Sequence, residues 1–309
     1  MGCSTGAGRQ LCGWLNLDKP VGISSLAAVA AVRRATGAAR AGHAGTLDPF
    51  ASGVLPVALG EATKTQRCVQ VGVKTYDFTV RWGEGRTTDD PEGEILSTSV
   101  HRPVTREIAS ALTEFTGAIK QIPPTFSAIK VAGRRAYSLA RAGHTVTLVP
   151  RIVRVDSFTL IDQPDDDHAR FRVTCGKGTY MRALARDLAQ RLGTCGHLTT
   201  LRRTRVGAFH VADAISLEKL IRLGHSASAD PHLISIASAL DGIPMLAVTD
   251  EEAGRLRSGQ AVPVSCPEDR RRMQGLGADD IMLAIAASTP VALARVEGVQ
   301  IKPVRVLNL

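Results

Sequence analysis

A single carboxylate in the segment RAGHAGTLDP, residues 40–49, stands where it could do chemistry. The glycines of this segment permit an irregular backbone, and the proline after Asp48 disfavours a helix at that position. A carboxylate held in such a loop can act as a nucleophile or as a base. Asp-Pro on its own is most often only a turn, so a chemical role for Asp48 depends on the residues that stand near it. Arg40 and His43 stand nearby in a basic segment.

The segment CGKGTYMRALARDLA, residues 175–189, joins the end of a predicted strand to a helix that starts near Thr179. Its Gly-Lys-Gly turn places Lys177 beside free backbone N–H groups and the positive end of the helix, where a phosphate would be favoured. Tyr180 and Arg182 are two residues apart in the first helical turn and therefore point in different directions. The glycine spacing and the missing Lys-Ser/Thr ending exclude a P-loop. The alternative to a catalytic role for this segment is a helix start that binds phosphate, with Tyr180 as an ordinary packed side chain.

A third candidate is Tyr76 in the segment KTY, residues 74–76. From there, apolar residues alternate with polar ones as far as Trp82, which is the pattern of a half-buried strand. A tyrosine in such a strand normally packs in the core or against a neighbouring strand. The residue type alone therefore does not assign Tyr76 a chemical role.

The charge of the chain is segregated along the sequence. The formal net charge is +9, yet residues 1–75 carry +5, residues 130–210 carry +9 and the remainder carries −5. Two basic segments in an otherwise acidic chain favour a folded surface with one positive face, as a phosphate backbone requires. Scattered, solvated arginines are the alternative that charge alone leaves open. Aromatic residues make up only 4% of the chain, which leaves little material for a broad base-stacking surface.

The elements that must position these residues indicate an α+β fold. Because predicted strands and helices follow one another in mixed order, without regular βα alternation, we expect a mixed, mainly antiparallel sheet. Basic residues mixed with Pro and Gly at 120–150 indicate an excursion from the core. The pattern predicts strands at 12–17, 74–82, 152–161 and 171–175 and helices at about 25–36, from Thr105 to before Gly117, and at about 179–192.

Length and composition indicate more than one domain. The chain has 309 residues, 44% of them hydrophobic and 22% charged, as in ordinary globular proteins. We expect a flexible N-terminus at 1–11, a catalytic domain at 12–240 and a small β-rich domain at 246–309. In that last domain Asp250 is expected to cap a short helix.

No metal, cofactor or membrane segment is expected. The six cysteines form no CxxC pair, and no histidine completes a zinc set, so they are interpreted as reduced thiols. The sequence has no dinucleotide-binding fingerprint. No run approaches the ~18 apolar residues that cross a bilayer. We therefore expect a cytoplasmic protein that works without a cofactor.

Several ordered segments, which cover most of residues 13–210, resemble the bacterial TruB family of tRNA pseudouridine synthases. The resemblance implies the pseudouridine synthase fold, and it implies isomerisation of the uridine at position 55 in the T-loop of tRNA by a monomer. Residues from about 246 resemble, more weakly, the family's PUA-type RNA-binding domain. The segments are GWLNLDKPVGISS (13–25), AGHAGTLDPFASGVLPVALGEATK (41–64), KTY (74–76), IPPTFSAIKVAGRRAYSLARAG (122–143) and KGTYMRALARDLA (177–189).

The resemblance also implies roles for individual residues. Asp48 corresponds to the catalytic nucleophile, and Tyr76 to a tyrosine that stacks on the target base and has been suggested as a proton acceptor. Tyr180 and Arg182 correspond to a conserved pair in which the arginine contacts the nucleophile. The expected RNA-binding residues are His43, Lys19 of the first motif's Lys-Pro, and the basic Lys130, Arg134, Arg135, Arg141 and Lys177.

These residue types suit that reaction. Breaking the N1–C1′ bond of uridine and rejoining the base through C5 requires an ionised carboxylate, either to attack the nucleoside or to abstract a sugar proton, and both routes use Asp48. The base must be swung out of the RNA, and stacking on Tyr76 recovers part of that energy. Two alternatives remain open: an RNA-binding factor that helps tRNA fold, and a synthase that acts on another structured RNA.

Overall fold

The structure, a computed structural model, describes residues 11–127, 129–131, 133–142, 145–224, 231–264, 277 and 280–309. The predicted flexible N-terminus therefore lies outside the described residues, apart from Leu11. The chain divides into two compact units, each assembled from separated segments. The first unit comprises Met1–Leu47, Val54–Gln70 and Gly207–Leu309, and the second comprises Asp48–Gly53 and Val71–Val206.

The second unit is built on an antiparallel sheet with the strand order β12-β4-β11-β10-β7. In the centre, Phe78 of β4 is in register with Leu201 of β12 and with Phe171 of β11. The first two residues of β3 add a short parallel pairing to β12. The sheet is therefore mixed and mainly antiparallel, which confirms the expected fold class. Its strands are β4 (Lys74–Trp82), β7 (Gly117–Gln121), β10 (Arg151–Asp165), β11 (His168–Cys175) and β12 (Gly196–Val206), with Ser52 and Gly53 of β3 (Ser52–Leu59), whose other residues belong to the first unit.

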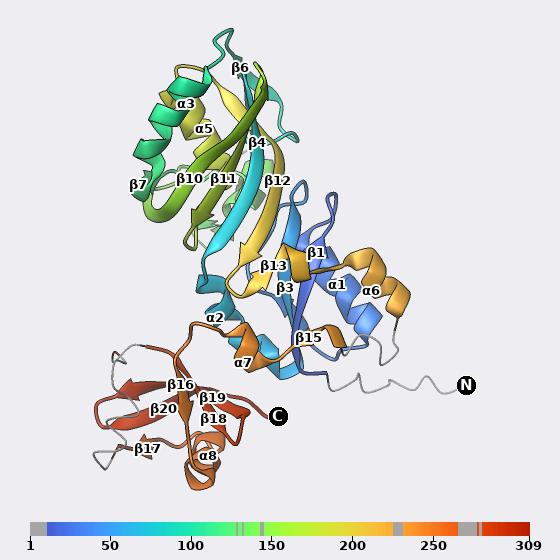
Figure 1. Ribbon diagram of the computed structural model, residues 1–309, viewed down its shortest axis with the longest axis vertical. Coiled ribbons are helices and arrows are strands. Elements are labelled where there is room, and N and C mark those ends of the chain that lie inside the picture. The colour runs from blue at the N-terminus through green and yellow to red at the C-terminus, as the bar shows by residue number, and fades with distance from the viewer. Residues whose placement is uncertain are drawn as a thin grey trace. The chain divides into compact units, whose positions relative to one another are not determined.

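Helices α3 (Thr105–Leu112) and α5 (Met181–Arg191) pack against this sheet (Figure 1). The alternation along β4 buries every second side chain as predicted, and the rings of Phe78 and Phe171 stack with centroids 5.6 Å apart. Helix α5 adds Leu184 and Leu188 to this core. The predicted start of α3 is correct. The α-helix ends at Leu112, earlier than predicted, and a 3-10 turn at Thr113–Phe115 follows it. Helix α5 begins two residues later than predicted.

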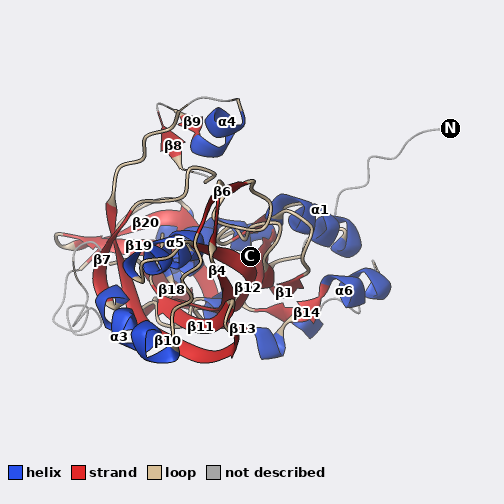
Figure 2. Cartoon of the chain, turned by 90° about the horizontal axis from the view of Figure 1, so that it is seen from above, coloured by secondary structure: helices blue, strands red, loops and turns tan. Residues whose placement is uncertain are grey.

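Two excursions leave the sheet of the second unit. Strands β5 (Glu84–Arg86) and β6 (Ile95–Thr98) form a hairpin whose turn is the polar sequence at 87–94. After β7, a long connection leads to the short pair β8 (Lys130–Val131) and β9 (Arg134–Arg135) and to α4 (Ala136–Arg141), as Figure 2 shows. The second excursion is the one that the sequence predicted at 120–150.

The first unit contains the N-terminal strand β1 and helix α1, which share one apolar core. Ser24 caps α1 by accepting a hydrogen bond from the Ala27 N–H at 3.1 Å, and Gly37, at φ +68°, ends it, so the helix spans the predicted range of about 25–36. Helices α1 and α6 pack together over β1. Its elements are β1 (Gly13–Lys19), α1 (Ser25–Thr36), β2 (Ala41–His43), α2 (Gln66–Val71), β13 (Phe209–His210), β14 (Ile215–Ser216), α6 (Leu217–Leu223), β15 (Leu233–Ile234), α7 (Ile236–Ala239) and 3-10 turns at Gly60–Thr65 and Val211–Asp213.

The C-terminal part forms a separate five-stranded sheet with its own apolar core, in the order β16-β18-β19-β20-β17. This confirms the predicted β-rich domain. Thr249, and not Asp250, caps its helix: the Thr249 hydroxyl accepts from the Glu252 N–H at 3.2 Å, and the Glu252 carboxylate accepts from the Thr249 N–H at 2.7 Å. The elements are β16 (Met245–Ala247), α8 (Asp250–Arg257), β17 (Val262–Pro263), β18 (Met282–Ala286), β19 (Thr289–Glu297) and β20 (Gln300–Val306).

Candidate active site

Asp48 lies in the loop between β2 and β3, within the second compact unit. Its backbone carbonyl accepts a hydrogen bond from the Ala51 N–H at 3.1 Å, which turns the chain toward β3. The side chain is 34% exposed, and Oδ2 lies 3.0 Å from Nε of Arg182. The Nε–H is not aligned with that oxygen as a hydrogen bond would be, so the contact is an ion pair. A partly exposed carboxylate beside a cation is both favoured in its charged form and open to a substrate.

Arg182, the second residue of α5, is fixed by several contacts around its guanidinium. Its side chain is only 6% exposed. Nη1 donates to the Thr88 carbonyl at 3.0 Å and to Oδ2 of Asp90 at 3.1 Å, and Nη2 donates to the Phe126 carbonyl at 2.9 Å. Because the guanidinium is planar and rigid, these contacts set the orientation in which it meets Asp48.

Asp90 is a second carboxylate on Arg182, and the sequence analysis missed it. Its side chain is 5% exposed. Oδ1 accepts hydrogen bonds from the Thr88 hydroxyl and from the Glu92 N–H, the latter at 3.1 Å. A buried ion pair needs such additional hydrogen bonds to offset the loss of hydration. The segment RTTDDPEG has the composition of a solvated turn, and its two adjacent acidic residues were the only available signal.

Tyr76 lies on the buried face of β4, in register with Arg203 of β12. It is 8% exposed and its hydroxyl hydrogen-bonds to Arg203. Burial raises the pKa of the Tyr76 phenol, Arg203 lowers it, and the neighbouring Asp48 carboxylate raises it, with a net increase. The phenol therefore keeps its proton at neutral pH, which suits stacking and hydrogen-bond donation better than proton acceptance.

Arg203 of β12 also belongs to this region. The sequence analysis did not identify it, because it is one of several arginines close together in the chain. It is buried, and its backbone lies against Gly53 at the start of β3. Gly53 has φ +105°, and a Cβ there would lie 2.2 Å from the Arg203 carbonyl oxygen, so the close approach requires glycine. Burial, with a smaller contribution from Arg203, lowers the pKa of the nearby Lys74 to about 8. The buried face around Tyr76 is therefore basic.

Tyr180 is the residue that precedes α5 and not a member of its first turn. Gln121 holds its backbone: Oε1 accepts from the Tyr180 N–H at 2.9 Å, and Nε2 donates to the Tyr180 carbonyl at 3.2 Å. Its partly exposed ring lies 5.1 Å from the guanidinium carbon of Arg151. Lys177 is exposed in the preceding turn. Tyr180 and Arg182 thus have separate partners, as their spacing predicted.

Two predicted RNA-binding residues lie in the first compact unit. Lys19 is fully buried, and its Nζ donates to the carbonyls of Pro20 at 2.7 Å and Ile23 at 2.9 Å. An ammonium enclosed in this way stabilises the turn after β1 and is not exposed at the surface to bind RNA, which corrects the expectation for Lys19. His43 ends β2, where it pairs with Val57, and is partly exposed.

The basic residues of the 120–150 excursion are described only in part. Arg134 is exposed and pairs through its backbone with Val131. The side chains of Lys130, Arg135 and Arg141 lie outside the described residues, although their backbone belongs to β8, β9 and α4. Their predicted RNA contacts stay predictions.

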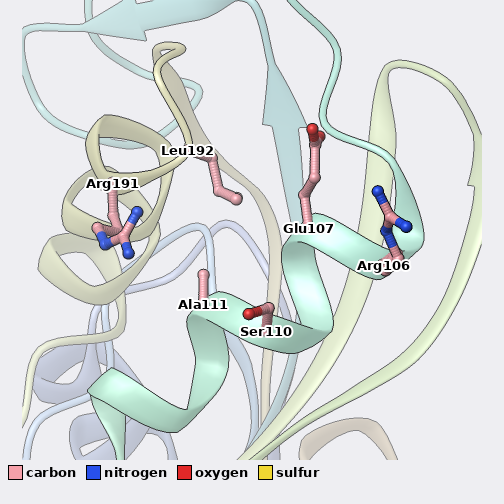
Figure 3. Close-up of a pocket in the computed structure, with 6 residues that line it drawn as sticks. All are labelled: Arg106, Glu107, Ser110, Ala111, Arg191 and Leu192. Carbon is pink, nitrogen blue, oxygen red and sulfur yellow. The ribbon is translucent and has the colours of Figure 1, made fainter.

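A surface pocket between α3 and the end of α5 does not contain the predicted site residues (Figure 3). Its Arg191 is held by Glu114 through two hydrogen bonds, and its Glu107 accepts from the Val104 N–H. Among the described residues, no group of three or more His, Cys, Asp or Glu could hold a metal ion. Within that same part of the chain, no helix is long and apolar enough to cross a membrane.

Comparison with known proteins places the chain in one family. Residues 33–181 match the family described as "TruB family pseudouridylate synthase (N terminal domain)", and residues 182–240 match "tRNA pseudouridylate synthase B C-terminal domain". The chain is 50% identical over 307 residues to tRNA pseudouridine synthase B of Bradyrhizobium diazoefficiens, covering 97% of this chain and 87% of that one. It is 48% identical over 307 residues to the protein of the same name from Caulobacter vibrioides, covering 98% of both.

Solved structures share the fold at lower identity. A chain of the crystal structure of the archaeal box H/ACA sRNP Nop10-Cbf5 complex superposes with a TM-score of 0.72 at 23% identity, covering 96% of this chain and 86% of that one. A chain from the structure of an H/ACA RNP bound to a substrate RNA containing 2′-deoxyuridine superposes equally well, with a TM-score of 0.72 at 23% identity and coverage of 96% and 85%.

The fold and the family matches together define an RNA-modifying isomerase of the pseudouridine synthase class. The chain belongs to the TruB family of pseudouridylate synthases, and it is a tRNA pseudouridine synthase. The enzyme class and the RNA substrate that the resemblance implied are thereby confirmed.

Proposed function

We propose that the chain converts the uridine at position 55 in the T-loop of tRNA to pseudouridine, with Asp48 as the catalytic carboxylate. The observation that carries this proposal is the ion pair between partly exposed Asp48 and buried Arg182. In the second compact unit the Asp48 side chain of this pair is partly exposed, while its cation is held by Asp90 and two backbone carbonyls.

The reaction exchanges one bond to the sugar for another. The N1–C1′ bond breaks and its electron pair leaves with the uracil, which turns so that C5 bonds to C1′. The proton on C5 is then lost and N1 gains one, so no oxidant, reductant or second substrate is consumed. Asp48 acts at the sugar, either by attack or by proton abstraction, and both routes need the negative oxygen that Arg182 orients.

The target uridine has to leave the RNA stack before Asp48 can reach it. Unstacking costs a few kcal/mol, and stacking on an aromatic ring recovers part of it. Tyr76 supplies that ring, with its hydroxyl fixed by Arg203. The raised pKa of Tyr76 argues for this stacking role over that of a base. Tyr180, at the start of α5, borders the same helix end as Arg182.

Basic residues outside the reacting centre would bind the RNA backbone. Exposed Lys177 and Arg134 are available for phosphates, and His43 would contact the loop from which the base has turned out. The excursion with Lys130, Arg135 and Arg141 would close over the RNA, and the C-terminal β-rich domain, of PUA type, would bind its outer part. We propose that the enzyme works in this way as a monomer in the cytoplasm.

The substrate and position are tested by release of tritium from C5-labelled RNA. The unmodified tRNA transcript should release one equivalent of tritium, and a transcript with cytidine at position 55 should release none. Other structured RNAs of similar length serve as the comparison. Equal release from the cytidine-55 transcript would refute the T-loop assignment, and faster release from another RNA would identify a different substrate.

A further inference from the structure

Helix α5 carries a second arginine, one turn after Arg182, whose contacts repeat the same arrangement. Nη1 of Arg186 lies 3.0 Å from Oδ2 of Asp89, and Nη2 donates to the Ile122 carbonyl at 2.8 Å. Arg182 makes the equivalent contacts with the next carboxylate along the chain and with a carbonyl four residues after Ile122. Each guanidinium therefore joins one carboxylate of the β5–β6 turn to one carbonyl of the connection that follows β7.

Asp89 is tied into this arrangement by its backbone as well as by its side chain. Its N–H donates to the Arg86 carbonyl at 3.1 Å, and its carbonyl accepts from the Leu198 N–H of β12 at 3.1 Å. Its φ is +59°, a left-handed conformation that Asp and Asn adopt more readily than most residues. The carboxylate is 13% exposed. The turn thus holds two consecutive buried carboxylates against the same helix.

The charge on Asp89 does not stabilise the fold at neutral pH. Burial raises the pKa of this carboxyl to about 6, although Arg186 and Arg182 lower it. Asp187 also contacts Arg186, with Oδ1 at 2.8 Å from Nη2, and burial raises its pKa too. Ionising a carboxylate buried in this way costs free energy, which the contacts with the arginines offset only in part.

We propose that Arg186, with Asp89 as its counter-ion, is a positioning residue that keeps Arg182 aligned on Asp48. The proposal rests on the function proposed above for Asp48. Arg186 fixes the β5–β6 turn and the start of the post-β7 connection against α5, and these two segments supply the acceptors that hold Arg182. Without Arg186, both segments are tied to the helix at fewer points. A misalignment of about 1 Å at a reacting centre can cost on the order of 100-fold in rate.

The test measures single-turnover tritium release, with enzyme in saturating excess over C5-labelled tRNA, so that an inactive fraction of enzyme does not lower the rate constant. Arg186→Gln should lower the rate constant at least about tenfold, and Arg186→Lys should restore it to within about threefold of the wild type, because the charge is kept. The affinity for tRNA, from filter binding, should change by less than about threefold.

The matched control is Arg191→Gln, which breaks another arginine–carboxylate contact on the same helix, the bidentate one with exposed Glu114. Its rate constant should stay within about twofold of the wild type. Asp89→Asn keeps the size of the side chain, removes its charge and should be about threefold slower. Because the enzyme is in saturating excess, a merely structural role for Asp89 would not lower the rate constant.

The outcomes separate this inference from the function on which it rests. A rate constant for Arg186→Gln within twofold of the wild type overturns the positioning role. If Arg186→Gln lowers the affinity for tRNA by the same factor as the rate constant, the positioning role is overturned as well, because Arg186 then contributes to RNA binding. Asp48→Asn, measured in parallel, should release no tritium; if it keeps the wild-type rate, the proposed function fails and the inference about Arg186 fails with it.

Discussion

Replacing Asp89 by asparagine should change how the stability of the second compact unit depends on pH. Burial raises the pKa of Asp89 and Asp187 adds to that effect, while Arg186 and Arg182 oppose it, so that the pKa rises from 3.8 to about 6. Between these two values the folded chain holds a proton that the unfolded chain has released. Rising pH therefore removes stability from the wild type but not from the asparagine variant. A difference of about 2 pH units corresponds to roughly 3 kcal/mol.

The measurement is urea unfolding at pH values from about 4.5 to 7.5. The chain has two tryptophans, Trp14 in the first compact unit and Trp82 in the second. In a Trp14→Phe background, the fluorescence of buried Trp82 reports on the unit that contains Asp89. The free energy of unfolding of the wild type, minus that of Asp89→Asn, should fall by roughly 2 kcal/mol between pH 4.5 and about 6 and level off above that. A difference that stays flat, or grows with pH, would refute the reasoning.

Three further substitutions test the site. Arg182→Lys cannot match the four acceptors around the guanidinium, so the single-turnover rate should fall at least about 100-fold, and a loss under tenfold would contradict its orienting role. Tyr76→Phe keeps the ring but loses the bond to Arg203 and should be about tenfold slower, whereas Tyr76→Leu should be slower still; equal rates would exclude stacking. Gly53→Ala should lower the melting temperature by several degrees, because its Cβ would meet backbone at 2.2 Å; an unchanged melting curve would be inconsistent with that close approach.

Local patterns predicted much of the fold. The alternation after Lys74 predicted β4, and the range of about 25–36 predicted for a helix matches α1. These signals are readable because each depends on residues close together in the chain. The C-terminal helix was predicted correctly, but its cap was placed one residue late, since Thr249 and Asp250 are both good capping residues.

The residues of the candidate site could be predicted only where they belong to a motif that resembles the family. The structure brings Asp48 and Arg182 together, as the resemblance implied, although 134 positions separate them in the sequence. Asp89 and Asp90 escaped prediction because a polar turn with adjacent acids is usually solvated, and their burial results from contacts with distant α5. Lys19 was misjudged for the opposite reason: a lysine is rarely fully buried, and local sequence does not show the carbonyls that enclose it.

The most direct test of the account is the comparison of Asp48→Asn with the wild type on the same tRNA. The substitution removes the negative oxygen and keeps the size of the side chain beside Arg182. Pseudouridine formation should be abolished in single-turnover assays, while filter binding of the tRNA stays within about threefold of the wild type. Pseudouridine formation at the wild-type rate by the asparagine variant would contradict the central role of this carboxylate.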